Sequence, residues 1–202
     1  YFNIDLEDRL GISQNFELTE EERAALIEAG VAGADSLATF RFFTNGIETN
    51  TEGVDIVATY VMDSSLGITD FNFAFNYTDT TVEGFVPGII DETRILEMET
   101  ALPDTRWNIM ANHTWDNWRV MARYSYFDDW YDSEDQLDYD GYGLFDAEIG
   151  YTFEGGFSVV AGANNLFDET PDKNPNAAAG VGNLYSQWAP GGFNGRFAYM
   201  RL

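Results

Sequence analysis

The sequence predicts an all-β fold, an antiparallel transmembrane β-barrel with about eight strands in its 202 residues. The first observation is alternation: in residues 118–126 and 145–153, apolar and largely aromatic side chains take every second position and mostly polar ones lie between them. The second is the rhythm of the connections, which alternate between long and short along the whole chain, as in outer-membrane barrels. The apolar set then faces lipid and the polar set lines a lumen.

The eight predicted strands follow this alternation in chain order. They cover residues 1–10, a stretch within 39–62, 71–78, 107–115, 118–127, 144–153, 157–167 and 193–202. In the second strand the alternation changes parity upstream of Gly53, which predicts a bulge or a rise of the strand above the membrane. We expect the lipid-facing set to include Phe71, Phe73, Phe75, Val120, Tyr124, Ile149 and Tyr151. We expect the lumen-facing set to include Asn72, Asn76, Arg119, Arg123, Asp146 and Glu148.

The connections between the predicted strands differ in character. Long ones span 11–38, 79–103, 128–143 and 168–192, and short turns lie at 63–65, 116–117 and 154–156. Aromatic pairs flank two short turns, Trp115 with Trp118 and Phe153 with Phe157, as in the aromatic girdles of membrane barrels. In the first long connection Thr19 and Glu22 have capping-box spacing, which predicts a helix that stops near Gly30.

Composition excludes several classes of protein. A formal charge of −25, from 35 acidic and 10 basic residues, repels nucleic acid, since a binder needs a basic patch to neutralise phosphates. The absence of cysteine excludes a disulfide scaffold and thiol chemistry. No apolar run approaches the ~18 residues of a membrane helix. No hydrolase nucleophile, phosphate-loop or zinc-protease motif occurs, so we expect no enzymatic activity and no cofactor.

Four segments resemble those of TonB-dependent outer-membrane receptors. The most specific is Asn-Asn-Leu-Phe-Asp at 164–168, which precedes a long loop and the Gly-Arg-Phe of 195–197. Thr-Glu-Gly-Val-Asp at 51–55 resembles the family's Gly-Val-Glu segment, and residues 1–10 resemble a strand that ends in Asp-Arg-Ile. Order and spacing agree over essentially all of the chain. One departure is Leu202, where such barrels usually end on an aromatic residue.

This resemblance implies a 22-stranded barrel of which residues 1–202 form the C-terminal portion. A plug domain, the earlier strands and a periplasmic energy-coupling segment are expected before Tyr1. The implied function is active transport across the outer membrane of a Gram-negative bacterium. The receptor would bind a scarce nutrient (a siderophore, cobalamin or an oligosaccharide) at extracellular loops and import it with TonB-derived energy. Implied partners are outer-membrane lipid and lipopolysaccharide, the TonB complex and the small-molecule nutrient.

Two other functions fit the alternating pattern. One is a self-contained eight-stranded outer-membrane barrel with a structural or adhesion role. The other is a soluble β-sandwich that binds carbohydrate, in which the apolar faces would form a core.

Aromatic residues of the outer loops are the candidate ligand contacts, because their rings stack on sugars or flat chelates. They are Trp130, Tyr131, Tyr139, Tyr142, Tyr185 and Trp188. The alternative is that these rings pack on one another over the barrel rim.

The acidic loop between residues 128 and 140 is a candidate divalent-cation site, because Ca²⁺ binds carboxylate and carbonyl oxygens. The candidate ligands are Asp132, Asp135, Asp138 and Asp140. The alternatives are a solvated loop, or carboxylates bridged through cations to lipopolysaccharide. His113, the single histidine, falls on the apolar face and is expected to be an interfacial ring and not a metal ligand.

Overall fold

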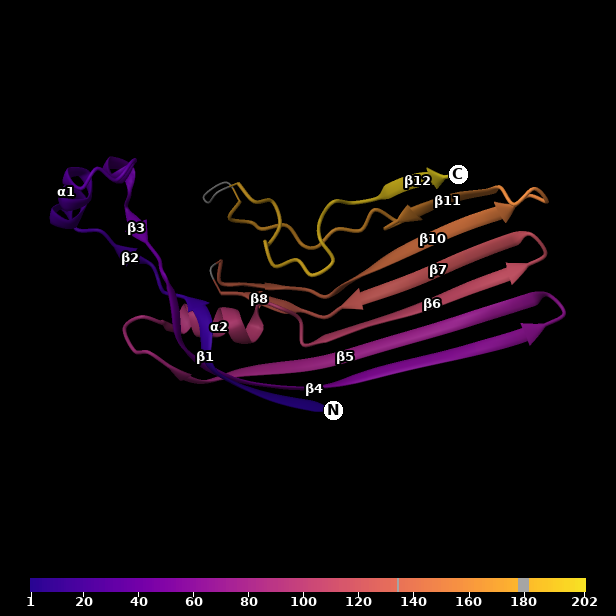
Figure 1. The fold of residues 1–202 in the computed structure, drawn as a ribbon, viewed down its shortest axis with the longest axis horizontal. Coiled ribbons are helices and arrows are strands. Elements are labelled where there is room, and N and C mark those ends of the chain that lie inside the picture. Colours follow the sequence, from indigo (N-terminus) through magenta and orange to yellow (C-terminus); the bar gives the residue numbers. More distant parts are fainter. Residues whose placement is uncertain (134, 178–181) are drawn as a thin grey trace. The chain divides into compact units, whose positions relative to one another are not determined.

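The computed structural model describes residues 1–133, 135–177 and 182–202, so Glu134 and part of the predicted loop 168–192 lie outside the described residues. Eight of its strands form one sheet in which each strand lies beside its neighbour in the chain, in the order β1-β4-β5-β6-β7-β10-β11-β12 (Figure 1). Their bounds are β1 Phe2–Ile12, β4 Phe43–Ser64, β5 Gly67–Phe85, β6 Thr105–Trp115, β7 Trp118–Phe127, β10 Tyr142–Thr152, β11 Ser158–Asn164 and β12 Phe197–Arg201. A single meandering sheet is what a barrel wall requires, whereas a β-sandwich needs two packed sheets.

Short elements decorate the long connections. Two small antiparallel pairs are β2 (Phe16–Glu17) with β3 (Thr39–Phe40), and β8 (Trp130–Asp132) with β9 (Leu137–Tyr139). The helices are α1 (Glu20–Glu28), the 3₁₀ turn η1 (Ala34–Ser36) and α2 (Glu92–Thr100). Among the described residues, none of the helices has the length and apolarity needed to cross a membrane.

The chain divides into two compact units, a wall unit and an excursion unit. The wall unit comprises Tyr1–Asn3, Glu52–Asp79 and Thr100–Leu202. The excursion unit comprises Ile4–Thr51 and Thr80–Glu99.

The strand register of the wall unit separates the two predicted sets of side chains. Residues directly opposite one another in antiparallel strands lie on the same face. One cross-strand row is Phe73, Ile109, Tyr124 and Phe145, and the next is Asn72, Met110, Arg123 and Asp146. The two sets therefore occupy opposite faces of one sheet, here called the apolar face and the polar face. The predicted alternation is confirmed.

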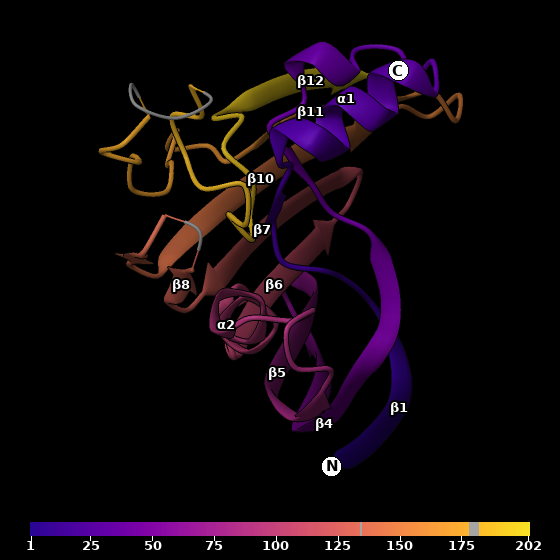
Figure 2. The ribbon, with the colours of Figure 1, turned by 90° about the vertical axis from the view of Figure 1, so that its left-hand side faces the viewer.

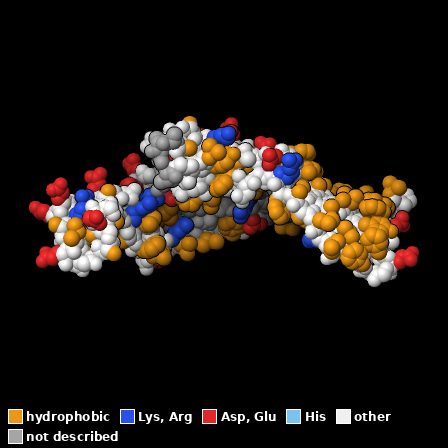
Figure 3. Space-filling view, turned by 90° about the horizontal axis from the view of Figure 1, so that it is seen from above, with side chains coloured by type: hydrophobic (Ala, Val, Ile, Leu, Met, Phe, Trp, Pro, Cys, Tyr) orange, Lys and Arg blue, Asp and Glu red, His pale blue; other side chains and the backbone are white. Residues whose placement is uncertain are grey.

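The connections of the wall unit confirm the predicted rhythm. The short turns between β4 and β5, β6 and β7, and β10 and β11 gather at one end of the strands, and the long loops lie at the other (Figure 1; Figure 2 views β6, β7 and β10 from the loop end). Trp115 stacks on Trp118 with ring centroids 6.2 Å apart, and Phe153 lies 5.9 Å from Phe157. Figure 3 shows hydrophobic side chains concentrated toward the turn end. Such a belt suits a membrane–water boundary.

Gly53 sits where a side chain cannot be accommodated. A Cβ there would meet the carbonyl oxygen of Tyr77 and would lie 3.0 Å from Cε1 of the Phe2 ring. β4 passes through this glycine without interruption and is 22 residues long, at least twice the ~9–11 residues that cross a bilayer. The change of parity therefore marks a strand that extends well past membrane length.

Several predicted boundaries were wrong. The connection 79–103 is not all loop, because β5 continues to Phe85 and helix α2 follows. β11 ends at Asn164 instead of residue 167, and the chain turns there because Asn165 and Asp168 adopt positive φ values of 50° and 64°, outside the β region. β12 begins at Phe197 rather than residue 193.

In the excursion unit, the predicted helix is confirmed. The Thr19 hydroxyl accepts a hydrogen bond from the Glu22 amide, and the Glu22 carboxylate accepts one from the Thr19 amide at 2.9 Å. The helix ends at Glu28 and Gly30 adopts a φ of +76°, so the predicted stop is also confirmed. Through its bonds to Thr19, the pKa of Glu22 is lowered.

Arginine substitutions on β5 test the assignment of the apolar face to lipid. Phe73→Arg is expected to lower the free energy of unfolding by about 2–4 kcal/mol, the cost of arginine facing lipid at mid-depth. Asn72→Arg, one position away on the polar face, is expected to change it by about 0.5 kcal/mol. Denaturant titration of the receptor in lipid vesicles measures both values. Equal losses for the two variants would contradict the assignment.

Candidate binding surface

A buried carboxylate joins three segments of the polar face. Asp146 on β10 is 6% exposed, and its Oδ2 accepts hydrogen bonds from Nε and Nη2 of Arg123 on β7 at 2.9 and 2.5 Å. Its Oδ1 accepts a third bond, 2.7 Å long, from the backbone amide of Asn165. Asp146 therefore holds the neighbouring strand and the start of the last long loop at once.

Glu148 organises a second charged group nearer the short turns. Its Oε2 accepts a bond from Arg119 at 2.6 Å, and its Oε1 accepts one from Arg201 at 2.7 Å and another from the Tyr199 hydroxyl. The group spans β7, β10 and β12 on the polar face. Each arginine in these two groups has a carboxylate partner, so its positive charge is neutralised by a salt bridge.

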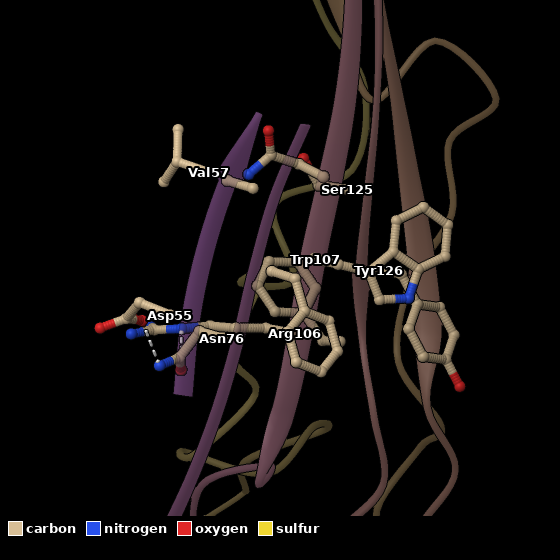
Figure 4. A pocket seen from close by; sticks show the side chains of 11 residues that line it. Asp55, Val57, Asn76, Arg106, Trp107, Ser125 and Tyr126 are labelled. Carbon is tan, nitrogen blue, oxygen red and sulfur yellow. Dashed lines mark hydrogen bonds between the residues drawn. The ribbon is translucent and has the colours of Figure 1, made fainter. Parts of the chain in front are cut away.

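A hollow of about 450 Å³ opens on the same face, close to the long loops (Figure 4). Arg106 donates from Nε to the amide oxygen of Asn76 at 3.0 Å, and the Asn76 amide donates to Oδ1 of Asp55 at 2.8 Å. In the next row Ala74 lies opposite Asn108, which lies opposite Ser125. The methyl group of Ala74, between longer side chains, is what leaves the space. The sequence pattern did not predict this hollow, although the alternation places a small residue, Ala74, between two polar-face asparagines, Asn72 and Asn76.

The outer-loop aromatic residues form a packed cluster. Trp130 and Tyr139 stack with ring centroids 5.2 Å apart, and Tyr142 lies 6.0 Å from Trp130. The amide of Gly191 donates to the Tyr142 hydroxyl at 2.8 Å, which brings the last long loop onto the cluster. We call this assembly of residues 128–133, 135–141 and 182–196 the cap. Figure 2 shows its two loops on the same side of the wall strands.

The structure divides the six predicted ligand contacts into two groups. Trp130, Tyr139 and Tyr142 are 3%, 2% and 7% exposed, so their rings serve the cap itself, as in the self-packing alternative. Tyr142 is moreover the first residue of β10 and not a loop residue. The other three are half-buried: Tyr131 in β8, Tyr185 stacked on Phe193, and Trp188 packed against the cluster. Only these three retain ring surface for a ligand.

The acidic residues of the cap connect loops. Asp132 is 2% exposed and accepts a 2.9 Å bond from the hydroxyl of Ser186, while Asp135 accepts a 2.6 Å bond from the Asn174 amide. Asp138 and Asp140 are exposed. Within residues 1–133, 135–177 and 182–202, no group of three or more acidic, histidine or cysteine side chains is arranged to hold a metal ion. The divalent-cation site at Asp132, Asp135, Asp138 and Asp140 therefore stays a prediction.

Tyr139 is buried among these acids. Burial raises the pKa of its hydroxyl, and Asp135, Asp132 and Asp172 raise it further by repelling a phenolate. The hydroxyl therefore stays protonated within the cap.

His113 lies on the apolar face near the short turns. One ring nitrogen is 2.8 Å from the Thr69 hydroxyl, and the ring stacks on Trp115 at 5.2 Å. Both contacts are structural, and they place the ring in the aromatic belt.

Comparison with known families decides the class of the protein. The model of the TonB dependent receptor-like β-barrel matches residues 1–166. The chain belongs to this family. A search of curated proteins gives no match. TonB-dependent receptors are transporters of the Gram-negative outer membrane and not enzymes, and the antiparallel sheet seen here is of the barrel type.

The Asn-Asn-Leu-Phe-Asp segment of this TonB-dependent receptor chain is a structural turn. The Asn165 amide group donates to the carbonyl of Glu169 at 2.6 Å and its oxygen accepts from the Glu169 amide at 2.8 Å. Asp168 accepts from the backbone amide of Arg196 at 2.7 Å. Because Gly195 has a φ of +68°, and a Cβ there would lie 2.8 Å from Asp168 Oδ1, the Gly-Arg pair and the Asp are matched parts of one turn.

Removal of the Asp146 carboxylate tests its central role. Asp146→Ala leaves the Arg123 guanidinium and the Asn165 amide without their acceptor, and is expected to lower the free energy of unfolding by about 1–3 kcal/mol. Asp5→Ala, which removes the exposed partner of Asn50, is expected to cost about 0.5 kcal/mol. Denaturant titration in detergent micelles measures both. A loss for Asp146→Ala no larger than that control would refute the role.

The pH dependence of stability provides a separate test at Asp104, before β6. Asp104 is exposed, but partial desolvation by neighbouring atoms raises the pKa of its carboxyl, and Asp79, Asp129 and Asp128 raise it further. Its ionisation therefore destabilises the folded state, and the cost is complete above the raised pKa and absent below the ordinary value of about 3.9. Asp104→Asn is expected to raise Tm at pH 7 and leave it unchanged at pH 3. Thermal melts across this range measure the difference, with Asp63→Asn as the charge-loss control.

Proposed function

We propose that this chain is part of a receptor that binds a scarce nutrient at its outer loops and imports it with TonB-derived energy. Candidate nutrients are a siderophore, cobalamin or an oligosaccharide. Residues 1–202 would form the C-terminal portion of a 22-stranded barrel, with a plug domain and the earlier strands supplied by the rest of the protein.

The observation that carries this proposal is the juxtaposition of the cap with the polar face. The cap contacts the outer end of that face through Tyr142, and its cluster includes Phe127 and Leu144, which belong to the wall strands β7 and β10. A ligand held by the loops would thus be delivered directly to a wall that carries paired charges and hydrogen-bonding groups. A water-filled or plug-filled lumen needs such a wall, and a lipid-facing or dry core surface does not.

The strand order favours an arc of a larger barrel over a closed barrel of eight. β1 and β12 stand at the two ends of the order, and the sheet of the described residues is not closed by pairing between them. An eight-stranded barrel requires that pairing. The structural or adhesion alternative depends on such a self-contained barrel.

The apolar face and the loops suggest the remaining partners. Exposed apolar side chains such as Ile109 and Ile149 would contact outer-membrane lipid, and the acidic outer loops would approach lipopolysaccharide through divalent cations. Coupling to the TonB complex would use a segment outside these residues.

Uptake measurements in cells test the transport function. Deletion of the receptor gene is expected to abolish growth on at least one limiting nutrient among iron chelates, cobalamin and oligosaccharides. Deletion of tonB is expected to give the same defect, because the plug moves only with inner-membrane energy. Uptake that needs the receptor but not TonB would refute the energy coupling, and no growth difference on any of these nutrients would refute the transport role.

Substitutions in the cap test the ligand contacts. Trp188→Ala and Tyr185→Ala remove half-buried rings and are each expected to weaken nutrient binding by about tenfold, the effect of losing one interface anchor. Phe153→Ala, in the short turn at the opposite end, is the matched control and is expected to leave binding unchanged. Isothermal titration of the purified receptor measures the affinities. If all three variants bind the nutrient as tightly as the wild type, Trp188 and Tyr185 are not ligand contacts.

A further inference from the structure

We propose that the hollow on the polar face is a subsite for a neutral, hydroxyl-rich group of the transported substrate, that is, a sugar residue of an uncharged oligosaccharide. The proposal rests on the transport function proposed above and narrows its substrate class. The polar residues concerned are Asp55, Asn76, Arg106, Asn108 and Ser125, and the floor is Ala74.

The first argument is the supply of unused hydrogen-bonding groups. Arg106 uses Nε on Asn76, and among the described residues its two terminal nitrogens have no hydrogen-bond partner. The Asn108 amide and the Ser125 hydroxyl also lack partners within the described part of the chain, and these two residues lie directly opposite each other on β6 and β7. Three side chains with unused donors thus line one hollow, alongside the free acceptor oxygens of Asn108, Ser125 and Asp55. A ligand that both donates and accepts through hydroxyl groups matches this set.

The second argument is the local charge balance. Arg119, Arg123 and Arg201 each reach a carboxylate at 2.5–2.7 Å, and so they offer little to a ligand. Arg106 instead connects to Asp55 only through the amide of Asn76 (Figure 4). Both charged groups are therefore held at the hollow, but they do not form a salt bridge with each other. An anionic ligand would meet Asp55, in a chain whose formal charge is already −25, and a cationic ligand would meet Arg106. A neutral ligand avoids both penalties and can use both groups.

The third argument is shape. About 450 Å³ falls in the range of roughly 300–1,000 Å³ typical of small-molecule sites. Val57, Ala74 and Phe127 add apolar surface to the lining, which suits the carbon–hydrogen face of a sugar ring. Phe127 also packs against Tyr142 of β10 with ring centroids 5.8 Å apart, and the Tyr142 hydroxyl accepts the bond from Gly191 of the cap, so the hollow lies next to the cap. A chain of sugar residues that leaves the cap would reach the hollow next.

Glycan binding by the full-length receptor in detergent tests the subsite. The probes are neutral hexasaccharides (malto-, cello-, xylo- and mannohexaose) and one acidic hexasaccharide, hexagalacturonate, measured by isothermal titration. We expect at least one neutral probe to bind and hexagalacturonate to bind at least tenfold more weakly. Arg106→Met and Asn108→Ala are each expected to lower the affinity for the neutral probe by at least tenfold. Ala74→Phe, which fills the floor of the hollow, is expected to abolish binding of the neutral probe.

Asn112→Ala is the matched control, because Asn112 lies on the same strand and polar face but outside the hollow, and it is expected to change affinity by less than twofold. Thermal melts of each variant verify folding, and a variant that fails to fold is replaced by Ser125→Ala. Three results would overturn the proposal: no neutral probe binds, hexagalacturonate binds more tightly, or the hollow variants match the control. If uptake of a nutrient still requires TonB in that case, transport stands and only the sugar subsite falls. Conversely, if a neutral hexasaccharide binds at the hollow but no nutrient is taken up in a TonB-dependent way, the subsite is upheld and the transport function is refuted.

Discussion

The structure of the wall and of its outer end depends on the hydrogen bonds that the buried carboxylate of Asp146 accepts. It accepts two bonds from Arg123 and one from the amide of Asn165, so one side chain couples β7, β10 and the turn that begins the last long loop. A carboxylate with 6% exposure is stable only when its oxygens are satisfied. This requirement explains why an arginine faces it across the strand pair and why the strand that follows must stop at Asn164.

The cap follows from that turn. Once Asn165 and Asp168 have redirected the chain, the segment that contains Ser186 and Gly191 returns to the outer end of β10, where it bonds to Asp132 and Tyr142. The acidic and aromatic residues of the two loops therefore bind the loops to each other. The ligand contacts that we propose are therefore the half-buried rim of the cap and the hollow beside Phe127, where a small residue and partly unused polar groups meet.

The motifs that relate this chain to TonB-dependent receptors have backbone explanations. Gly53 allows close approach of the Phe2 ring and the Tyr77 carbonyl, and Gly195 has the positive φ that lets Asp168 accept from the Arg196 amide. Asn165 bonds to both backbone groups of Glu169. These residues build the wall and its last turn, and so they identify the family without carrying information about the substrate.

The sequence by itself determined the strands of the wall, their two faces, the short-turn end and the helix after Thr19, because alternation, turn residues and a capping box are local patterns. It did not reveal α2, the early end of β11 or the burial of Trp130, Tyr139 and Tyr142. Those depend on contacts between residues far apart in the chain, such as Asp146 with Asn165 and Tyr142 with Gly191. The hollow is of the same kind: Asp55, Asn76, Arg106 and Ser125 come from four strands, and only the cross-strand register brings their side chains to one place.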